Sequence, residues 1–273
     1  TSGWVMVNAS GTLNGTSGAT RPMLLSEWST DIVNTHQLQL MALDRAANYT
    51  LRADLDFALE MAAGPSGLWR VAANAVPTTE GMAYGFVPVG NGSVDFINPF
   101  TGSFDGAGHT IFNLTIQRPN SVDVGLFGRA QNATIRDVRL ADVDVLGMQR
   151  VGGLVGYNLA NGGDASISGS HVSGVVSGAQ TVGGLVGYNQ ATGLNSTASI
   201  SGSYASATVN GGVGGNGYNV GGLVGANGAA DGGHASIDRS YATGLVNGSV
   251  GGTSYYVGGL VGSNFVYASG AGA

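Results

Sequence analysis

The sequence predicts an all-β protein folded as a parallel β-helix (a β-solenoid), and three observations support this fold class. Glycine makes up 49 of the 273 residues and charged residues only 10%, a composition that favours short strands joined by tight turns. One hexamer, Val-Gly-Gly-Leu-Val-Gly, occurs four times. A second signature with alternating apolar residues recurs between these copies, as in structural repeats that stack on one another.

The hexamer marks a repeat of variable length. Its copies begin 31, 38 and 37 residues apart, at Val151, Val182, Val220 and Val257. Two positions after each copy stands an asparagine, namely Asn158, Asn189, Asn227 and Asn264. The second signature begins at Ala165, Ala198 and Ala235. The additional length falls in Gly/Asn-rich spacers such as residues 211–216, which are predicted to be loops.

Each part of the repeat has a predicted role. We expect the hexamer to be a short strand whose glycines allow neighbouring coils to approach closely. The asparagine is expected at a turn, where it tolerates left-handed geometry and hydrogen-bonds to the next coil. Residues 167–172 alternate with period 2, which predicts a strand with one buried face. One such pair cannot bury its own apolar face, so copies are predicted to stack about 4.8 Å apart, with about two turns of the solenoid per repeat.

Less regular copies precede these repeats. Residues 124–128, with the sequence VGLFG, stand in for the hexamer, and residues 133–140 stand in for the second signature. Upstream, residues 100–116 have a strand–turn–strand pattern. The predicted solenoid therefore covers residues 96–273.

Residues 1–95 are predicted to form an irregular amino-terminal capping region packed on the solenoid. This segment holds all three Trp, all three Glu and five of the six Met, as suits the bulkier end of a repeat array. Residues 34–45 predict a short helix with Asn34 or Thr35 as its cap. Residues 48–57 alternate and predict a strand.

These residues resemble a known family. The hexamer core, Gly153–Gly156 in the first copy, resembles the GLUG repeat. Residues 38–58, 85–90, 100–116 and 124–128 are similar to segments of filamentous-haemagglutinin-like exoproteins of the two-partner secretion type. The resemblance covers about Leu38 to Gly262. It implies a right-handed β-helix in a secreted bacterial adhesin whose full-length form has an outer-membrane secretion partner.

Composition excludes several classes of partner. The net charge of −6 and the lack of a basic patch argue against nucleic acid. The absence of cysteine excludes disulfides and Cys-based metal sites. The sequence contains no run of eighteen apolar residues, so no membrane-spanning helix is predicted. We expect the array to be cut within a repeat and any export signal to lie outside this sequence.

Catalytic chemistry has little support in the sequence. Asp54 with Asp56, and Asp142 with Asp144, could bind calcium or supply an acid and a base, but a solvated outer face with Leu55, Val143 and Val145 inward is favoured. Salt bridges among the residues of the Arg136–Arg139 segment are expected. His171 occupies the repeat slot of Tyr204 and Tyr241, and His109 lies in a predicted turn. No metal-binding spacing and no nucleophile elbow occur, so no catalytic residue, metal ligand or cofactor is predicted.

Recurring tyrosines are the candidate ligand contacts. Stacked aromatic rings could bind sugars, while stacking between coils for stability is the alternative. The recurring tyrosines are Tyr157, Tyr188, Tyr204, Tyr218, Tyr241, Tyr255 and Tyr256. The candidate contacts chosen among them are Tyr157, Tyr188, Tyr218, Tyr255 and Tyr256.

The sequence thus favours the non-enzymatic β-helical part of a large secreted adhesin at the bacterial cell surface. Its expected partners are host-cell or bacterial surface glycans or proteins, or exopolysaccharide. A stalk of a contact-dependent toxin-delivery exoprotein is one alternative, because it would use the same rod. A polysaccharide-degrading β-helix enzyme is the other, and it would need a groove with charged residues clustered on consecutive coils.

Overall fold

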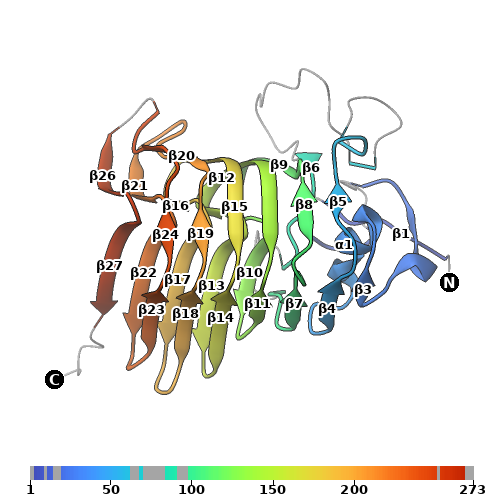
Figure 1. The fold of residues 1–273 in the computed structure, drawn as a ribbon, viewed down its shortest axis with the longest axis horizontal. Helices are drawn as coiled ribbons and strands as arrows, with labels where there is room; N and C mark the ends of the chain where they lie inside the picture. Colours follow the sequence, from blue (N-terminus) through green and yellow to red (C-terminus); the bar gives the residue numbers. More distant parts are fainter. Residues whose placement is uncertain are drawn as a thin grey trace.

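The structure is a computed structural model that describes residues 3–8, 11–14, 20–61, 68–69, 84–90, 98–250 and 253–267. It is an elongated stack of parallel coils, with the first described strand, β1, near one end of the long axis and the last, β27, near the other (Figure 1). The described residues contain a single short α-helix and 27 short strands. The predicted fold class, a parallel β-helix, is confirmed.

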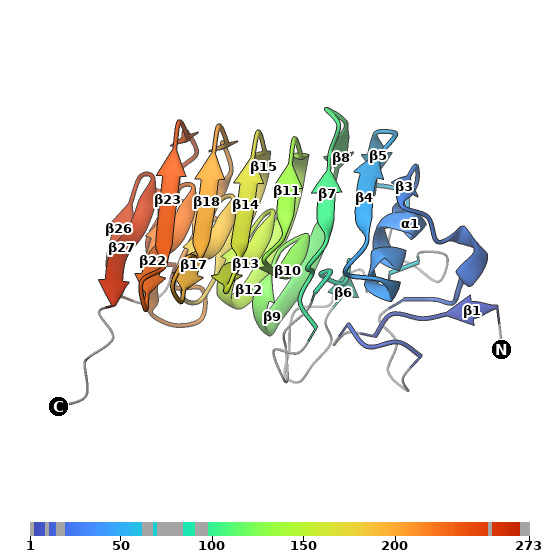
Figure 2. The ribbon, with the colours of Figure 1, turned by 90° about the horizontal axis from the view of Figure 1, so that it is seen from below.

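Three sheets run along the stack. Sheet I has seven strands, which Figure 2 shows side by side: β3 (Asp31–Ile32), β4 (Asn48–Leu51), β7 (Ser103–Asp105), β11 (Thr134–Arg136), β14 (Asp164–Ser168), β18 (Thr197–Ser201) and β23 (His234–Asp238). Sheet III has five strands: β10 (Phe127–Gln131), β13 (Val155–Asn161), β17 (Val186–Thr192), β22 (Val224–Ala230) and β27 (Val261–Tyr267).

Sheet II is the largest, with thirteen strands. They are β5 (Leu55–Asp56), β6 (Tyr84–Gly85), β8 (Thr110–Phe112), β9 (Thr115–Val124), β12 (Arg139–Gly152), β15 (His171–Gly178), β16 (Val182–Gly183), β19 (Tyr204–Ala205), β20 (Thr208–Asn210), β21 (Gly217–Gly221), β24 (Tyr241–Ala242), β25 (Val246–Asn247) and β26 (Ser254–Gly258). All these pairings are parallel except that of β6 with β9.

One repeat makes one turn of the solenoid. Val151 pairs with Val182, Val182 with Val220, and Val220 with Val257. The second signature behaves in the same way, because Ile167 pairs with Ile200 of the next copy. The prediction of about two turns per repeat is therefore wrong. The two signatures lie on different sheets of a single turn, and each pairs with its own next copy.

The hexamer is a corner and not a strand. In the first copy, Val151 and Gly152 end β12 of sheet II, and Val155 begins β13 of sheet III. Gly153 and Leu154 between them form the bend. The prediction of a single short strand is wrong, because the chain changes sheets in the middle of the motif.

The glycines of the hexamer are required by close backbone approach. None of them has a positive φ, so a left-handed conformation is not the reason. A Cβ on Gly152 would lie 2.3 Å from the Val155 carbonyl oxygen, and one on Gly187 would lie 2.5 Å from the Val151 nitrogen. Both distances are far inside van der Waals contact, so the corner closes only when these positions carry no side chain.

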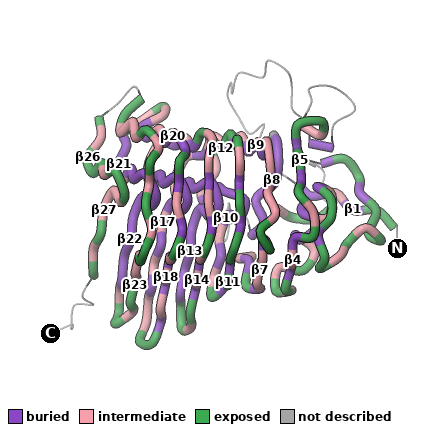
Figure 3. Tube along the Cα trace, viewed as in Figure 1, coloured by how far each residue is buried: buried purple, intermediate pink, exposed green. Residues whose placement is uncertain are grey.

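The core changes character along the axis. Near the amino-terminal end it is aromatic, with Phe100 and Phe104 packed on Phe127 at centroid distances of 4.7 and 5.4 Å. In the GLUG-like repeats it is aliphatic, with Leu154, Leu185 and Leu223 fully buried at the corner. Figure 3 shows this buried interior, and exposed residues on the outer surface and at the turns. Burial of this continuous apolar surface is the main term that stabilises the stack.

A buried asparagine ladder runs through sheet III. The Asn158 amide nitrogen donates to Asn189 Oδ1 at 2.7 Å, Asn189 donates to Asn227 at 2.8 Å, and Asn227 donates to Asn264 at 2.8 Å. Asn189 also donates to the Ala198 carbonyl across the core at 3.1 Å. The predicted bond to the next coil is confirmed. The predicted turn is wrong, because these residues lie within strands and point inward.

A serine ladder occupies the corner between sheets I and II. Ser170 and Ser203 are fully buried. The Ser203 hydroxyl donates to the Ser201 carbonyl at 2.9 Å and accepts from the Ser170 backbone N–H at 3.1 Å. Ser240 repeats this arrangement one coil further on. The hydroxyl thus satisfies backbone groups that a bend removes from the sheet ladder.

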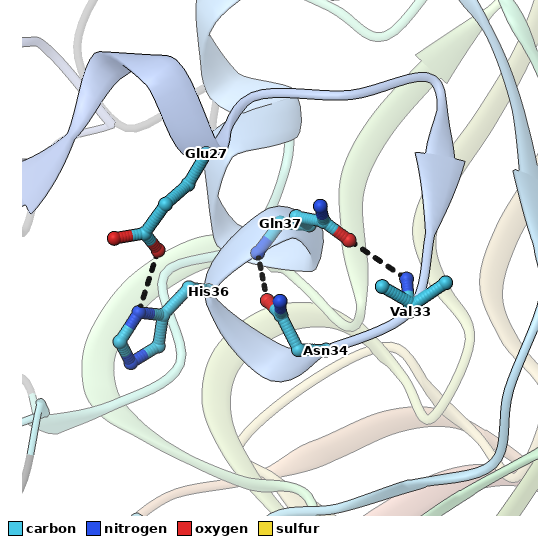
Figure 4. A network of polar contacts seen from close by, with 5 residues as sticks. All are labelled: Glu27, Val33, Asn34, His36 and Gln37. Atoms are coloured by element: carbon cyan, nitrogen blue, oxygen red, sulfur yellow. Dashed lines mark hydrogen bonds and ion pairs between the residues drawn. The ribbon is translucent and has the colours of Figure 1, made fainter.

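The predicted helix is confirmed as α1 (Thr35–Leu40), which is preceded by the 3₁₀ turn η1 (Leu25–Glu27) and followed by η2 (Met41–Leu43). Asn34 is the cap, and its Oδ1 accepts from the Gln37 backbone N–H at 2.9 Å (Figure 4). Gln37 reaches back to accept from the Val33 N–H at 2.8 Å. His36 on the same helix contacts Glu27 at 2.9 Å. These contacts satisfy N–H groups at the start of the helix and hold it against η1.

The strand ladders of the solenoid reach into the first 95 residues. β3 pairs with β4, and β4 pairs with β7. The predicted strand over residues 48–57 is two strands, because the chain bends after β4 and enters sheet II as β5. At the far end, β1 (Trp4–Val5) pairs antiparallel with β2 (Met23–Leu24).

A glycine substitution tests the corner. A Cβ on Gly222 would lie 2.1 Å from the Gly259 carbonyl oxygen, whereas a Cβ on Gly259 would meet nothing within 4 Å. We expect Gly222→Ala to lower the free energy of unfolding by about 1–3 kcal/mol or more, because backbone must shift. Gly259→Ala, the matched control, should change it much less. Chemical denaturation of both variants measures the difference, and equal effects would contradict the close-approach account.

The asparagine ladder predicts a graded response. Asn189→Ala removes partners from buried groups on both neighbouring coils, and each such group costs about 1–3 kcal/mol when left unsatisfied. Asn264→Ala removes an exposed end of the ladder and should cost less. Urea unfolding of the two variants checks this order. A smaller loss for Asn189→Ala would show that the ladder contributes little.

Candidate functional site

The candidate site consists of columns of aromatic side chains on the outside of the coils. Parallel pairing in register places a residue of one coil directly against the equivalent residue of the next. Three columns form in this way: Tyr157–Tyr188, His171–Tyr204–Tyr241 and Tyr218–Tyr255.

The Tyr157 column lies on sheet III and is largely covered. Tyr157 stacks on Tyr188 with ring centroids 5.2 Å apart and planes within 9°. The guanidinium groups of Arg129 and Arg150 lie 5.0 and 4.9 Å from the Tyr157 ring centroid. Arg129 belongs to the preceding coil and Tyr188 to the following one, so both faces of the Tyr157 ring are occupied. Only 8% of Tyr157 is exposed, and its hydroxyl donates to Gln190.

A buried ion pair supports this column. Asp123 is fully buried and pairs with Arg150, its register neighbour on the next coil. Burial raises the pKa of the Asp123 carboxyl, and the charges of Arg150 and Arg129 oppose that shift. Burial also raises the pKa values of Tyr157 and Tyr188. These tyrosines therefore stay protonated in neutral solution, and the cluster holds the column in place.

The second column lies on sheet II. His171 stacks on Tyr204 at 3.9 Å, and Tyr204 stacks on Tyr241 at 4.9 Å with planes within 7°. The pairing register confirms that His171 takes the slot of the two tyrosines. Tyr204 and Tyr241 are absent from the predicted contact set. The alignment of the repeats, which puts them at the same position as His171, was the signal that could have identified this column.

The third column is the most exposed part of the predicted contact set. Tyr218 on β21 stacks on Tyr255 of β26 at 5.3 Å, with planes within 10°. The exposed fractions of Tyr218, Tyr255 and Tyr256 are 43%, 61% and 58%. Beside them, Asn216 accepts hydrogen bonds from the backbone and hydroxyl of Thr253. Rings and amide groups of this kind are the usual partners of sugars, although a stacked ring offers only its edge or an uncovered face.

The two carboxylate pairs, Asp54 with Asp56 and Asp142 with Asp144, lie on the outer surface of the coils. Asp54 accepts from the Thr110 backbone N–H at 2.8 Å and contacts His109. The His109 backbone N–H donates to the Gly106 carbonyl at 2.9 Å, which closes the predicted turn. Asp56 accepts from the Asn113 side chain at 2.7 Å. Asp142 and Asp144 are exposed, while Leu55, Val143 and Val145 point inward. Hydrogen bonds lower the pKa values of Asp54 and Asp56, as they do for carboxylates that remain ionised.

The expected salt bridges in the Arg136–Arg139 segment have a different partner. Arg136 pairs with Asp105 on the preceding coil at 2.6 Å. The register Thr134–Arg136 against Ser103–Asp105 explains the pairing, because it puts Asp105 directly beside Arg136. The ion-pair partner of Arg136 is thus its register neighbour on the preceding coil and not a neighbour in the sequence.

The enzymatic alternative meets one serine–histidine contact. His171 Nε2 lies 3.1 Å from Ser206 Oγ. The charged residue beside His171 is Arg139, which lowers the pKa of His171 together with burial and cannot orient the ring as a carboxylate would. Within the described ranges, no three His, Asp or Glu side chains gather as a metal site. In the same ranges, no helix is long and apolar enough to span a membrane.

The comparisons with known proteins agree with the repeat and the fold. Residues 149–177 and 178–210 match the family described as the GLUG motif. A stretch of 164 residues is 32% identical to halomucin of Haloquadratum walsbyi (strain DSM 16790 / HBSQ001), and it covers 58% of this chain and 2% of halomucin. The chain thus spans a very small part of that relative. The resemblance to GLUG repeats is confirmed, while the filamentous-haemagglutinin-like, two-partner secretion type stays a prediction.

One solved structure has a similar fold. It is a Bacteroides ovatus protein named as a candidate immunoglobulin A1 protease, with a TM-score of 0.56 and 22% identity. The match covers 86% of this chain and 61% of that chain. At this level of identity the likeness concerns the β-helical fold and not the chemistry.

The His171 column predicts a pH dependence. Burial and Arg139 lower the pKa of His171 below its ordinary value of 6.5, so the folded state favours the neutral ring. The contribution to stability is present above pH 6.5 and is lost as the pH falls below it, because the unfolded chain then binds the proton more readily. We expect His171→Tyr, which continues the tyrosine column, to flatten the fall in unfolding free energy between pH 7 and about 5. His234→Tyr, at an exposed position, is the control, and an unchanged slope in His171→Tyr would contradict the prediction.

Proposed function

We propose that this chain is part of a large secreted surface protein and acts there as a non-enzymatic adhesive rod. The observation that carries the proposal is that inward side chains fill the core of each coil and bond it to the next. Aliphatic side chains and asparagine ladders fill the inside, so the outer side chains are free to serve recognition. The GLUG matches and the identity to part of halomucin support a repeat region of a large extracellular protein.

The proposed ligands are surface glycans of host cells or other bacteria, or matrix exopolysaccharide. Tyr218, Tyr255 and Tyr256 are the proposed contacts, because they combine exposed rings with the neighbouring amide of Asn216. Tyr157 and Tyr188 enter the proposal only through the stability of the column, since the Tyr157 ring is covered on both faces. Aromatic side chains with polar tips are well suited to such interfaces.

A glycan array tests the proposal. The chain should bind a subset of surface glycans or exopolysaccharides, and the double variant Tyr218→Ala/Tyr255→Ala should bind them more weakly. Leu194→Ala, an exposed apolar residue on the turn after β17, is the matched control and should leave binding unchanged. Absence of binding to every glycan would reject the adhesive role and leave a spacer.

A further inference from the structure

We propose that the outer face of sheet II between β15 and β25 binds an uncharged linear polysaccharide that runs along the solenoid axis. This inference rests on the proposed glycan-binding function but names a different surface and a ligand class. The face, called here the neutral face, consists of the outward side chains of β15, β19, β20, β24 and β25. Figure 1 shows β15, β19 and β24 next to one another on one side of the molecule.

Two parallel columns build the neutral face. The first is the stacked series His171, Tyr204 and Tyr241. The second is a polar ladder in which Asn210 donates to Ser177 Oγ at 3.2 Å and Asn247 donates to Asn210 Oδ1 at 2.7 Å. The ladder uses only part of the hydrogen-bonding capacity of each amide, so donors and acceptors remain for a ligand.

Charge selects the class of ligand. The outward positions from His171 to Ser177, from Tyr204 to Asn210 and from Tyr241 to Asn247 carry no Asp, Glu, Lys or Arg. Charged residues lie only at the borders of this face, namely Arg139 and Asp144 one coil earlier and the Asp238–Arg239 ion pair just before Tyr241. An acidic or basic polymer would find no counter-charge here, whereas a neutral sugar chain needs only hydroxyl and amide partners and apolar ring edges.

The stacking limits how the sugar can bind. Tyr204 lies between His171 and Tyr241, so its ring faces are covered and its edge and hydroxyl point outward. The face therefore offers one aromatic edge, from His171, Tyr204 or Tyr241, and one amide or hydroxyl per coil, at the strand spacing of about 4.8 Å. A sugar chain extended along the axis advances by a similar distance per residue. Successive sugars can thus meet equivalent groups on successive coils.

Size argues against a folded protein as the partner. Three coils, with seven residues along each coil from the aromatic column to the polar ladder, span about 14 Å by 23 Å. That area is well below the roughly 800 Å² per partner of a standard protein interface. The strands β15, β19 and β20 are paired on both sides, so a peptide could add a strand only at β24 and β25, which end the ladder within the described residues.

Binding of oligosaccharides of increasing length tests the proposal. The probes are the β-1,4-linked glucose and N-acetylglucosamine series from dimer to hexamer, followed by calorimetry. Affinity should rise with each sugar up to about three residues, the number of coils on the face. Tyr204→Phe and Tyr241→Phe keep the stack and remove one hydroxyl each, so each should weaken binding about 2- to 10-fold. Tyr188→Phe, on sheet III, is the matched control and should bind as the parent does.

The outcomes separate this inference from the proposed function. Affinity independent of chain length, equal affinity for polygalacturonate, or unchanged binding in Tyr204→Phe would overturn it. If binding is lost in Tyr218→Ala/Tyr255→Ala but kept in Tyr204→Phe, glycan binding stands and the neutral face is wrong. Binding of an unstructured peptide in place of every sugar would also overturn it. Absence of all saccharide binding would reject both proposals together.

Discussion

The backbone contact at the hexamer corner is the constraint on which the rest of the structure depends. Sheets II and III meet there with carbonyl and amide groups where side chains would otherwise lie, and Gly152 and Gly187 are the positions that permit it. Because the corner has one geometry, each coil leaves it in the same direction. Equivalent residues of successive coils are then forced into register, and every ladder in the molecule follows from that register.

The ladders differ in what they contribute. The leucines at the corner bury apolar surface, which supplies stability without specifying an exact partner. The asparagine ladder is more demanding, because a slip of one residue would leave buried amides such as that of Asn189 without partners. The asparagine ladder therefore fixes the register between coils, which the packing of the leucines alone would not specify. The ladder starts at Asn158, because its neighbour on the preceding coil is Ala130. The asparagine ladder therefore fixes the register of the GLUG-like repeats.

Much of this could be read from the sequence, and the part that could not has a physical reason. Spacing predicted which residues stack, and His171 falls against Tyr204 as its slot requires. The N-cap of α1 could also be predicted from the sequence, because capping is a local interaction. The corner at the hexamer could not be predicted, because glycine between valines is compatible with either a strand or a bend. The same ambiguity predicts a turn at Asn158, because the inward direction of its side chain depends on where the chain bends before it.

The candidate site shows a related gap between recurrence and availability. A tyrosine that recurs at the same position of neighbouring repeats stacks on its own copy, and stacking covers the ring faces that a sugar would use. Tyr157, between Arg129 and Tyr188, is the clearest case. What remains outside is the edge of each ring and the hydroxyl or amide beside it. In the proposed glycan-binding role, recognition would depend on rows of edges along the axis, and a linear ligand that repeats at the coil spacing would fit such rows better than a compact one.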